Sequence, residues 1–432
     1  MDIGIIGILI FAVLIVLIFA GLPIAFAIGL TALVGIWVFI GPDAMSQLAT
    51  LSFKYASDPT FALVPLFVIM AELLSKSGVA EQAFDAANKW FGKVRGGLGV
   101  STQVAGALFG ACCGSSSGGT ATIGLAAMPQ LRKHKYESGF AAGMIASAGG
   151  LSILIPPSAI LILYGILTEA SIGKLFIAGI LPGVVVLVLY STYVLIHAKV
   201  RPQDAEPEMV NVTWGERFAS LKNVWAFILI GLGVLGSIYA GICTALESAS
   251  VGAFLSLVVA GVYRKLTWQN VTEAMLSAAK MSCFIFFILL AAFTFSYLIN
   301  YLGIPMMLAE GIMASGMGAT GFVLLSLGVF VVLGCLLDPA GIIVLTVPTL
   351  LPVMTALNVD FIWFGVILVL AMMIGNITPP VGINLFVVKN IAPDIPMTSI
   401  MRGTAPYVLL LLVAIALVFF FPAIATVLPN MM

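Results

Sequence analysis

The sequence nearly repeats itself at an offset of 223 residues. Each copy has a polar interruption, an apolar run that contains a proline, and a long apolar segment that is broken by two consecutive prolines. The matched positions are Cys112 with Cys335, Pro129 with Pro352, and Pro156-Pro157 with Pro379-Pro380. In many secondary transporters, two such halves build one central substrate site within the membrane. The repeat therefore indicates transport.

The composition restricts the chain to the membrane. Hydrophobic residues make up 62% of the sequence, charged residues make up 8%, and the mean hydropathy is +1.20. Apolar stretches long enough to cross about 30 Å of hydrocarbon follow one another almost without interruption. We therefore predict an all-α polytopic membrane protein, and a soluble fold is excluded.

Basic residues orient the predicted spans. When Arg95, Lys133 and Lys389 are placed in the cytoplasm and the spans alternate, 16 of the 18 Lys and Arg residues fall inside. Both termini then lie outside, on the periplasmic side of a bacterial inner membrane, and the two halves have opposite orientations. The predicted spans are 3–20, 24–40, 60–75, 137–168, 173–197, 223–241, 243–262, 281–300, 361–388 and 405–428.

The domain organisation follows from this topology. Residues 1–197 form the first inverted repeat, residues 198–222 form a cytoplasmic connector, and residues 223–432 form the second inverted repeat. Residues 76–95 are predicted to form a helix along the inner surface, and residues 264–280 are interpreted in the same way.

Two further stretches are predicted to be re-entrant helical hairpins. Basic residues flank 98–131 on both sides, and its centre is the polar run CCGSSSGGT at 112–120, so the chain enters from the cytoplasm, turns at 114–119 and returns. Its counterpart 319–355 turns near 337–341. Irregular backbone at this depth is tolerated only where protein or water surrounds it.

The hairpin tips and the broken helices carry the candidate chemistry. At the first tip, the helix that ends exposes carbonyls that suit Na⁺, and the helix that begins exposes amides that suit a carboxylate. Prolines within 137–168 and 361–388 free further carbonyls. A packing seam of small residues at the tip and purely structural kinks at the prolines are the alternatives.

Asp338 is the single carboxylate in the second hairpin. An acid at membrane depth is costly and usually pairs with an ion or a base. The alternative is an aspartate that only caps the start of a helix. Gly382 and Asn384 follow the second proline pair and offer a close backbone approach and an amide.

The sequence of these segments resembles that of the large membrane subunit (the DctM-like permease) of tripartite ATP-independent periplasmic (TRAP) transporters. The resemblance lies in GALFGACCGSSSGGTATIGLAAMPQ and ILIPPSAILILYG in the first half, and in GCLLDPAGIIVLTVPTLLPV and IGNITPPVGINLFV in the second. The segment around Thr244-Ala245-Leu246-Glu247 is a weakened form of the family's Thr-Pro-Thr-Glu-Ala segment, and the Asp-Pro pair expected before Phe364-Gly365 is replaced.

The resemblance implies an inverted-repeat, elevator-type, Na⁺-coupled importer of carboxylated solutes such as C4-dicarboxylates or sialic acids. It also implies a small four-helix membrane subunit and a soluble periplasmic substrate-binding protein as partners. The Na⁺ ligands that we expect are Gly114, Ser115, Ser116, Ile155, Asp338, Gly341, Asn376 and Thr378. The substrate-binding residues that we expect are Ser116, Ser117, Gly118, Thr120, Pro157, Ser158 and Asn384.

Three other functions remain as alternatives. A free-standing divalent-anion/Na⁺ symporter would show similar hairpins and broken helices but would need no binding protein. An intramembrane enzyme would need a nucleophile and a base together, and the serines at 115–117 have no histidine or lysine nearby in the sequence. An uncoupled channel is disfavoured because paired hairpins with broken helices favour alternating access.

Overall fold

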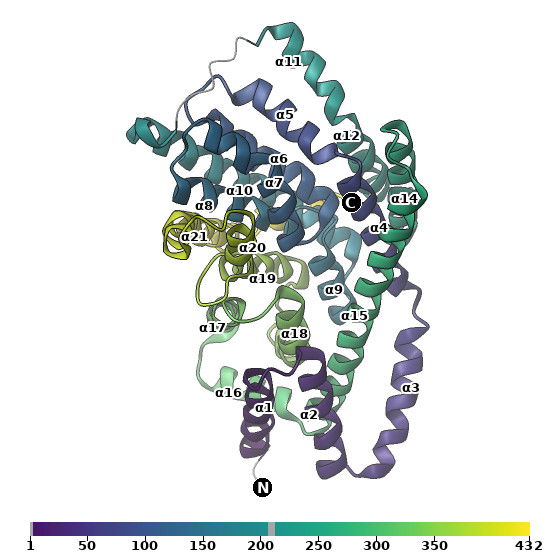
Figure 1. Cartoon of the computed structure of the whole chain (residues 1–432). Helices are drawn as coiled ribbons and strands as arrows, with labels where there is room; N and C mark the ends of the chain where they lie inside the picture. Colours follow the sequence, from purple (N-terminus) through teal and green to yellow (C-terminus); the bar gives the residue numbers. More distant parts are fainter. Residues whose placement is uncertain (1–2, 206–211) are drawn as a thin grey trace.

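A computed structural model describes residues 3–205 and 212–432 of the chain. Every regular element in these residues is a helix (Figure 1). The first half contains α1 Ile3–Phe19, α2 Ile24–Phe39, α3 Met45–Ala56, α4 Leu63–Lys76, α5 Val79–Phe91, α6 Gly97–Cys113, α7 Ser116–Lys133, α8 Ser138–Gly150, α9 Ala159–Thr168 and α10 Ile172–Val200. The second half contains α11 Trp214–Ser220, α12 Trp225–Gly231, α13 Ser237–Tyr239, α14 Ala245–Val262, α15 Trp268–Tyr301, α16 Ile304–Ala314, α17 Gly318–Gly334, α18 Pro339–Ala356, α19 Phe361–Asn376, α20 Ile383–Ile391, α21 Met397–Phe420 and α22 Ala423–Asn430.

Seven helical segments of the described chain are long and apolar enough to cross a membrane. They are Pro59–Lys76, Ile172–Val200, Trp214–Tyr239, Ala245–Val262, Trp268–Tyr301, Pro339–Ala356 and Met397–Phe420. The prediction of a polytopic helical membrane protein is therefore confirmed. The predicted spans 3–20 and 24–40 are helices of 17 and 16 residues, a little shorter than the roughly 20 residues that a perpendicular crossing needs.

Two predicted elements differ in the structure. The segment 264–280 was expected to be a separate surface helix, and this expectation is wrong. A turn at 263–267 leads directly into α15, whose 34 residues run without a break from Trp268 to Tyr301, because no proline or glycine interrupts them. The span predicted at 405–428 also ends early, since the helix stops at Phe420 before Pro422 and resumes as α22.

The first predicted hairpin consists of α6 and α7, which are joined by only two residues. Gly114 adopts a left-handed conformation (φ +61°), and the side chain of Ser115 accepts a hydrogen bond from the amide of Gly118 to start α7. The predicted turn at 114–119 is therefore too long, because the run from Ser116 onward is helical. In the second hairpin, α17 ends at Gly334 and α18 begins at Pro339.

Both proline pairs interrupt helices at matching places. The first lies between α8 and α9, and the second lies between α19 and α20. Each pair contains a cis peptide bond, at Pro156-Pro157 and Pro379-Pro380. The two halves thus share a helical hairpin followed by a broken helix, while their opposite orientation in a membrane stays a prediction.

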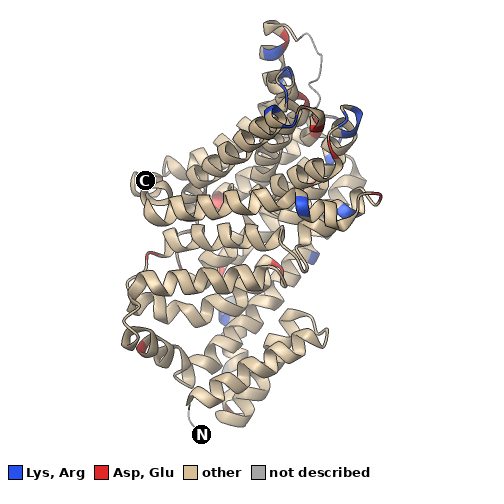
Figure 2. Cartoon of the chain, turned by 90° about the vertical axis from the view of Figure 1, so that its left-hand side faces the viewer, with Lys and Arg blue, Asp and Glu red and all other residues tan. Residues whose placement is uncertain are grey.

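The hairpins and broken helices pack together into one body. Helix α7 packs on α8 and α20, α17 packs on α19, and α18 packs on α9. The long helix α15 runs beside this body and contacts α2, α4 and α18 (Figure 1). Lys and Arg gather toward the upper and right-hand part of the molecule in Figure 2, whereas the C-terminus lies on the left.

Candidate functional site

The two hairpin tips meet at one cavity, which we call the central cavity. Its volume is about 190 Å³, and it lies where both tips, both broken helices and α15 converge. The lining residues are Gly114, Ser115, Ser116, Ser117, Ile153, Ala159, Ile160, Leu163, Met281, Phe284, Ile285, Asp338, Pro339, Ala340, Asn376 and Ile383. Segments more than 200 residues apart in sequence therefore share one site.

Each tip is held against the proline break of its own half. A Cβ atom on Gly114 would lie 3.0 Å from the carbonyl oxygen of Pro157, so only glycine fits there without displacement. In the second half, the amide of Val381 donates a hydrogen bond of 3.0 Å to the carbonyl of Cys335. Gly334 and Gly375 also touch through their backbones. Each tip thus contacts the proline break of its own half, but through different contacts.

A hydrogen-bonded asparagine joins the two halves. The Nδ2 of Asn384 on α20 donates to the hydroxyl of Ser116 at 2.9 Å and to the carbonyl of Ala146 at 2.9 Å. Both Asn384 and Ser116 are buried. Thr120, one turn further along α7, donates to the carbonyl of Ser116 at 2.8 Å. These contacts fix the first tip relative to the second broken helix.

Asp338 caps the helix that begins at the second tip. One carboxylate oxygen, Oδ2, accepts hydrogen bonds from the amides of Ala340 at 3.1 Å and Gly341 at 3.2 Å. The capping alternative is thus present in the structure. The same carboxylate also lines the central cavity, so capping and ion binding are compatible roles. At the matching position of the first half, Ser115 caps α7.

Asn376 carries the clearest signal of ligand binding. Its side chain is 1% exposed and lines the central cavity, yet neither Oδ1 nor Nδ2 has a hydrogen-bond partner in the described structure. Buried polar groups in native proteins are almost always satisfied, and an unsatisfied one costs about 1–3 kcal/mol. A cation beside Oδ1 and an acceptor such as a carboxylate beside Nδ2 would together remove this cost.

Helix ends of both kinds meet at the central cavity. The N-termini of α7 and α18 carry partial positive charge toward it, and the C-terminal ends of α6 and α19 carry partial negative charge. Such an arrangement suits an anion and a small cation side by side. The described residues contain no group of three or more His, Cys, Asp or Glu side chains that could hold a transition metal.

The other predicted site residues lie at different distances from the cavity. Gly118 and Pro157 line a second cavity that adjoins the first, and buried Thr120 and Asn384 hydrogen-bond to Ser116 at the tip. Ser158 is buried too, but its hydroxyl donates to the carbonyl of Ile153 within the first broken helix. The side chain of Ile155 packs against Gly183 on α10 instead. Gly341 is buried beside Asp338, and the hydroxyl of Thr378 donates to the carbonyl of Ile374 at 2.6 Å.

The second cavity, which we call the inner cavity, was not predicted. It has a volume of about 280 Å³ and is lined by α4, α15 and the first tip. Glu72, Ser75 and Ser277 are among its lining residues. A carboxylate on an apolar helix, four residues before Lys76, was the available signal.

The fold and the central cavity define a class of protein: a polytopic helical membrane protein whose paired hairpins and broken helices enclose one site, as in secondary transporters. The family model described as "Tripartite ATP-independent periplasmic transporter, DctM component" matches residues 11–424. The chain belongs to this family, which confirms the resemblance seen in the sequence and classes it with transporter permeases.

Curated relatives support the assignment over the whole length. The chain is 33% identical over 405 residues to a C4-dicarboxylate TRAP transporter large permease of Pseudomonas aeruginosa, covering 94% of both chains. It is 29% identical to a sialic acid TRAP transporter large permease of Vibrio cholerae, covering 96% of both. Among solved structures, the YdaH transporter of Alcanivorax borkumensis shares the fold, with a TM-score of 0.60 at 18% identity and 88% coverage of both chains.

Proposed function

We propose that this chain is the large permease of a Na⁺-coupled importer of carboxylated solutes in a bacterial inner membrane. The observation that carries the proposal is the central cavity, where the carboxylate of Asp338 and two helix N-termini converge with the amide of Asn376, which has no partner among the described residues. Oxygen ligands and the carbonyl ends of helices suit Na⁺, and the helix N-termini suit a substrate carboxylate.

We further propose that the tips and breaks move together against α4 and α15 as an elevator. The hydrogen bonds from Asn384 to Ser116 and from Val381 to Cys335 tie the hairpins and broken helices into one unit. A cavity separates the first tip from α4, so movement there disturbs little close packing.

The proposed orientation places the basic face in the cytoplasm. Lys54, one of two basic residues assigned outside, lines a cavity of about 680 Å³ together with Glu169, Thr244 and the C-terminal Met432. The topology predicted from the basic residues places these four residues on the periplasmic side. This agreement supports a periplasmic C-terminus.

The family is tripartite, so we propose two partners: a small four-helix membrane subunit and a soluble periplasmic substrate-binding protein. A relative that is described as a C4-dicarboxylate permease and another described as a sialic acid permease make a carboxylate the proposed substrate class. The alternative is a free-standing divalent-anion/Na⁺ symporter.

Uptake by reconstituted vesicles tests the proposal. The chain and its small subunit are placed in proteoliposomes, and labelled succinate or sialic acid is supplied with and without its cognate binding protein. We expect uptake only with both an inward Na⁺ gradient and the binding protein. Uptake without the binding protein would favour the free-standing symporter, and uptake that is indifferent to Na⁺ would overturn the coupling.

A further inference from the structure

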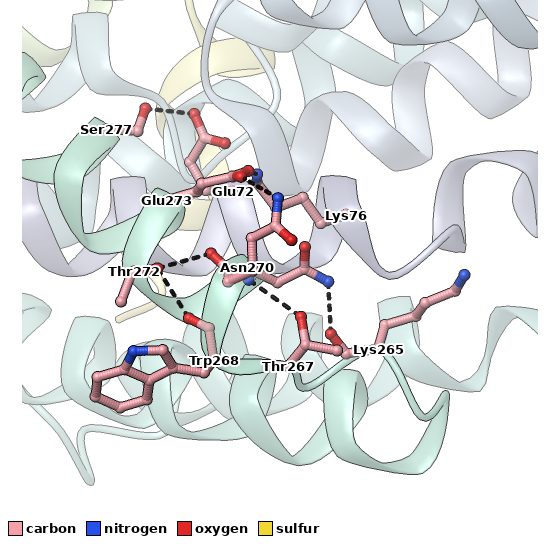
Figure 3. Close-up of polar contacts among 10 residues, drawn as sticks. Glu72, Lys76, Lys265, Thr267, Trp268, Asn270, Thr272, Glu273 and Ser277 are labelled. Carbon is pink, nitrogen blue, oxygen red and sulfur yellow. Dashed lines mark hydrogen bonds and ion pairs between the residues drawn. The ribbon is translucent and has the colours of Figure 1, made fainter.

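Two polar contacts connect the C-terminal end of α4 to the N-terminal part of α15, as Figure 3 shows. The hydroxyl of Ser277 donates a hydrogen bond of 2.6 Å to Oε1 of Glu72, and Lys76 forms an ion pair with Glu273. The partners are four residues apart on each helix. The two contacts therefore lie one helical turn, about 5.4 Å, apart along the interface.

Only the first of these contacts borders the inner cavity. Glu72 and Ser277 line it, whereas Lys76 and Glu273 are absent from its described lining and pair with each other. The positive charge of Lys76 is thus matched by Glu273. Glu72 brings a carboxylate to the cavity wall whose hydrogen-bond partner there is a neutral hydroxyl.

The inner cavity faces the first hairpin tip. Cys113, Ser115 and Ser117 form its opposite wall, and Ser115 and Ser117 also line the central cavity. The first tip therefore lies between the two cavities. In the proposed orientation, the neighbouring Lys76–Glu273 pair lies toward the cytoplasm, so this is the release side.

We propose that Glu72 is a release and specificity residue in the substrate path. Its carboxylate repels an anionic substrate in the inner cavity and attracts the coupling cation, so a carboxylate released from the central cavity is not readily recaptured from the cytoplasm. Charge repulsion in a partly enclosed cavity is much stronger than in bulk water, because the surrounding protein screens it less. The role in release rests on the proposed import of carboxylates.

The surroundings hold Glu72 in this position. The hydrogen bond from Ser277 orients the carboxylate, and the Lys76–Glu273 pair keeps α4 and α15 in register one turn away. Ser277 and the ion pair are positioning residues in this account. Ser277→Ala should leave the charge in place and weaken only its orientation.

Charge-selective cysteine labelling tests the electrostatic effect of Glu72 in the inner cavity directly and needs no knowledge of the substrate. Cys113 lines the inner cavity and serves as the reporter in a full-length chain whose other cysteines, Cys112, Cys243, Cys283 and Cys335, are replaced by alanine. Cationic and anionic methanethiosulfonate reagents are applied from the cytoplasmic side. We expect the cationic reagent to react faster and Glu72→Gln to lower the ratio of the two rates roughly three- to tenfold.

Controls separate the charge from other effects. Glu310→Gln removes an exposed carboxylate on α16, outside the described lining of this cavity, and should leave the ratio unchanged. Glu72→Met, a neutral side chain of similar length on an apolar helix, is a second variant that should lower the ratio equally if Glu72→Gln does not fold. An unchanged ratio in these neutral variants, or failure of both reagents to reach Cys113, would overturn the proposal.

Transport by the same proteoliposomes separates this inference from the proposed function. In Glu72→Gln, the concentration of succinate on the cytoplasmic side that halves import should fall roughly three- to tenfold, while Glu72→Asp should behave like the wild type. No carboxylate uptake by the wild type would contradict the proposed function and leave the labelling ratio to decide on Glu72. Normal import with unchanged inhibition in Glu72→Gln would contradict the role in release.

Discussion

The two hairpin-and-break units share a sequence pattern but differ in burial. Pro156, Pro157 and Ser158 are buried in the first unit, whereas Pro379, Pro380 and Val381 are exposed in the second. The first break is covered by α10, where Gly179 and Gly183 let the helix approach Leu154 and Ile155 closely. The proline pair sets the local break, and the neighbouring helices decide its accessibility.

The tips differ in chemistry as well. The first tip offers neutral hydroxyls and ties itself to the second broken helix, while the second tip offers the carboxylate of Asp338. We infer that the first unit supplies a neutral wall of the site and the second supplies its charge. Four substitutions test this division, beginning with the one of largest expected effect.

Gly114→Ala should abolish transport and destabilise the protein. The left-handed backbone costs a non-glycine residue about 1–2 kcal/mol, and the new Cβ would meet the carbonyl of Pro157 at 3.0 Å. Gly318→Ala is the matched control, since Gly318 has φ +60° but no atom of the described residues lies within 4 Å of its Cβ position. Gly114→Ala should lower the melting temperature and the uptake rate more than Gly318→Ala does. Equal effects of the two substitutions would contradict a close fit between the first tip and the first break.

Asp338→Asn should raise the Na⁺ concentration required for half-maximal uptake about tenfold or more, with little loss of stability. Asparagine caps helices about as well as aspartate, so only the charge is removed. Ser115→Ala, at the matching position, should cost about 1 kcal/mol through the lost cap. Unchanged Na⁺ dependence in Asp338→Asn would show that Asp338 only caps the N-terminus of α18.

Asn376→Leu should leave the Na⁺-free protein as stable as the wild type or more stable by about 1 kcal/mol, because it removes a buried amide that has no hydrogen-bond partner in the described part of the chain. Asn384→Leu is the contrast, since that amide is fully used and its loss should cost about 1–3 kcal/mol. The free energies of unfolding of the two variants are compared in Na⁺-free buffer. Equal destabilisation would show that the Asn376 amide stabilises the protein as much as the Asn384 amide does.

Asp394→Asn should have the smallest effect. Arg132 on α7 donates a hydrogen bond of 2.6 Å to Asp394 after α20, and this bond lowers the pKa of the exposed carboxyl. The pair therefore stabilises the fold above the ordinary aspartate pKa of about 4 and loses its effect as the pH falls through the lowered value. Melting temperatures of wild type and variant should differ slightly at neutral pH and converge in acid. A constant difference would exclude this pair as the cause.

Local signals made much of this structure predictable. Polar tips, basic flanks and proline pairs act within a few residues, so the hairpins and broken helices were found close to their observed positions. The length of the first turn was not predicted correctly, because Gly119 and Thr120 belong to α7 and pack closely on Gly149 and Ser152 of the next segment. Tertiary contact overrides the low helix propensity of glycine there.

The long-range contacts could not be predicted from the sequence. Nothing local connects Glu72 with Ser277 or Asn384 with Ser116, since each pair is more than 200 residues apart. The continuity of α15 was missed because polar residues between Trp268 and Lys280 resemble a surface helix. In the structure, Glu273 and Ser277 use this polar face to contact α4.

The most direct test of the central claim is the thermal stability of the purified chain with its small subunit in Na⁺, compared with equal K⁺ or choline. A ligand that binds only the native state must stabilise it, by about 2.7 kcal/mol at 100 times its dissociation constant. We predict a Na⁺-selective rise in melting temperature that is lost in Asn376→Leu. The same melting temperature in all three cations would contradict a Na⁺ site at the central cavity.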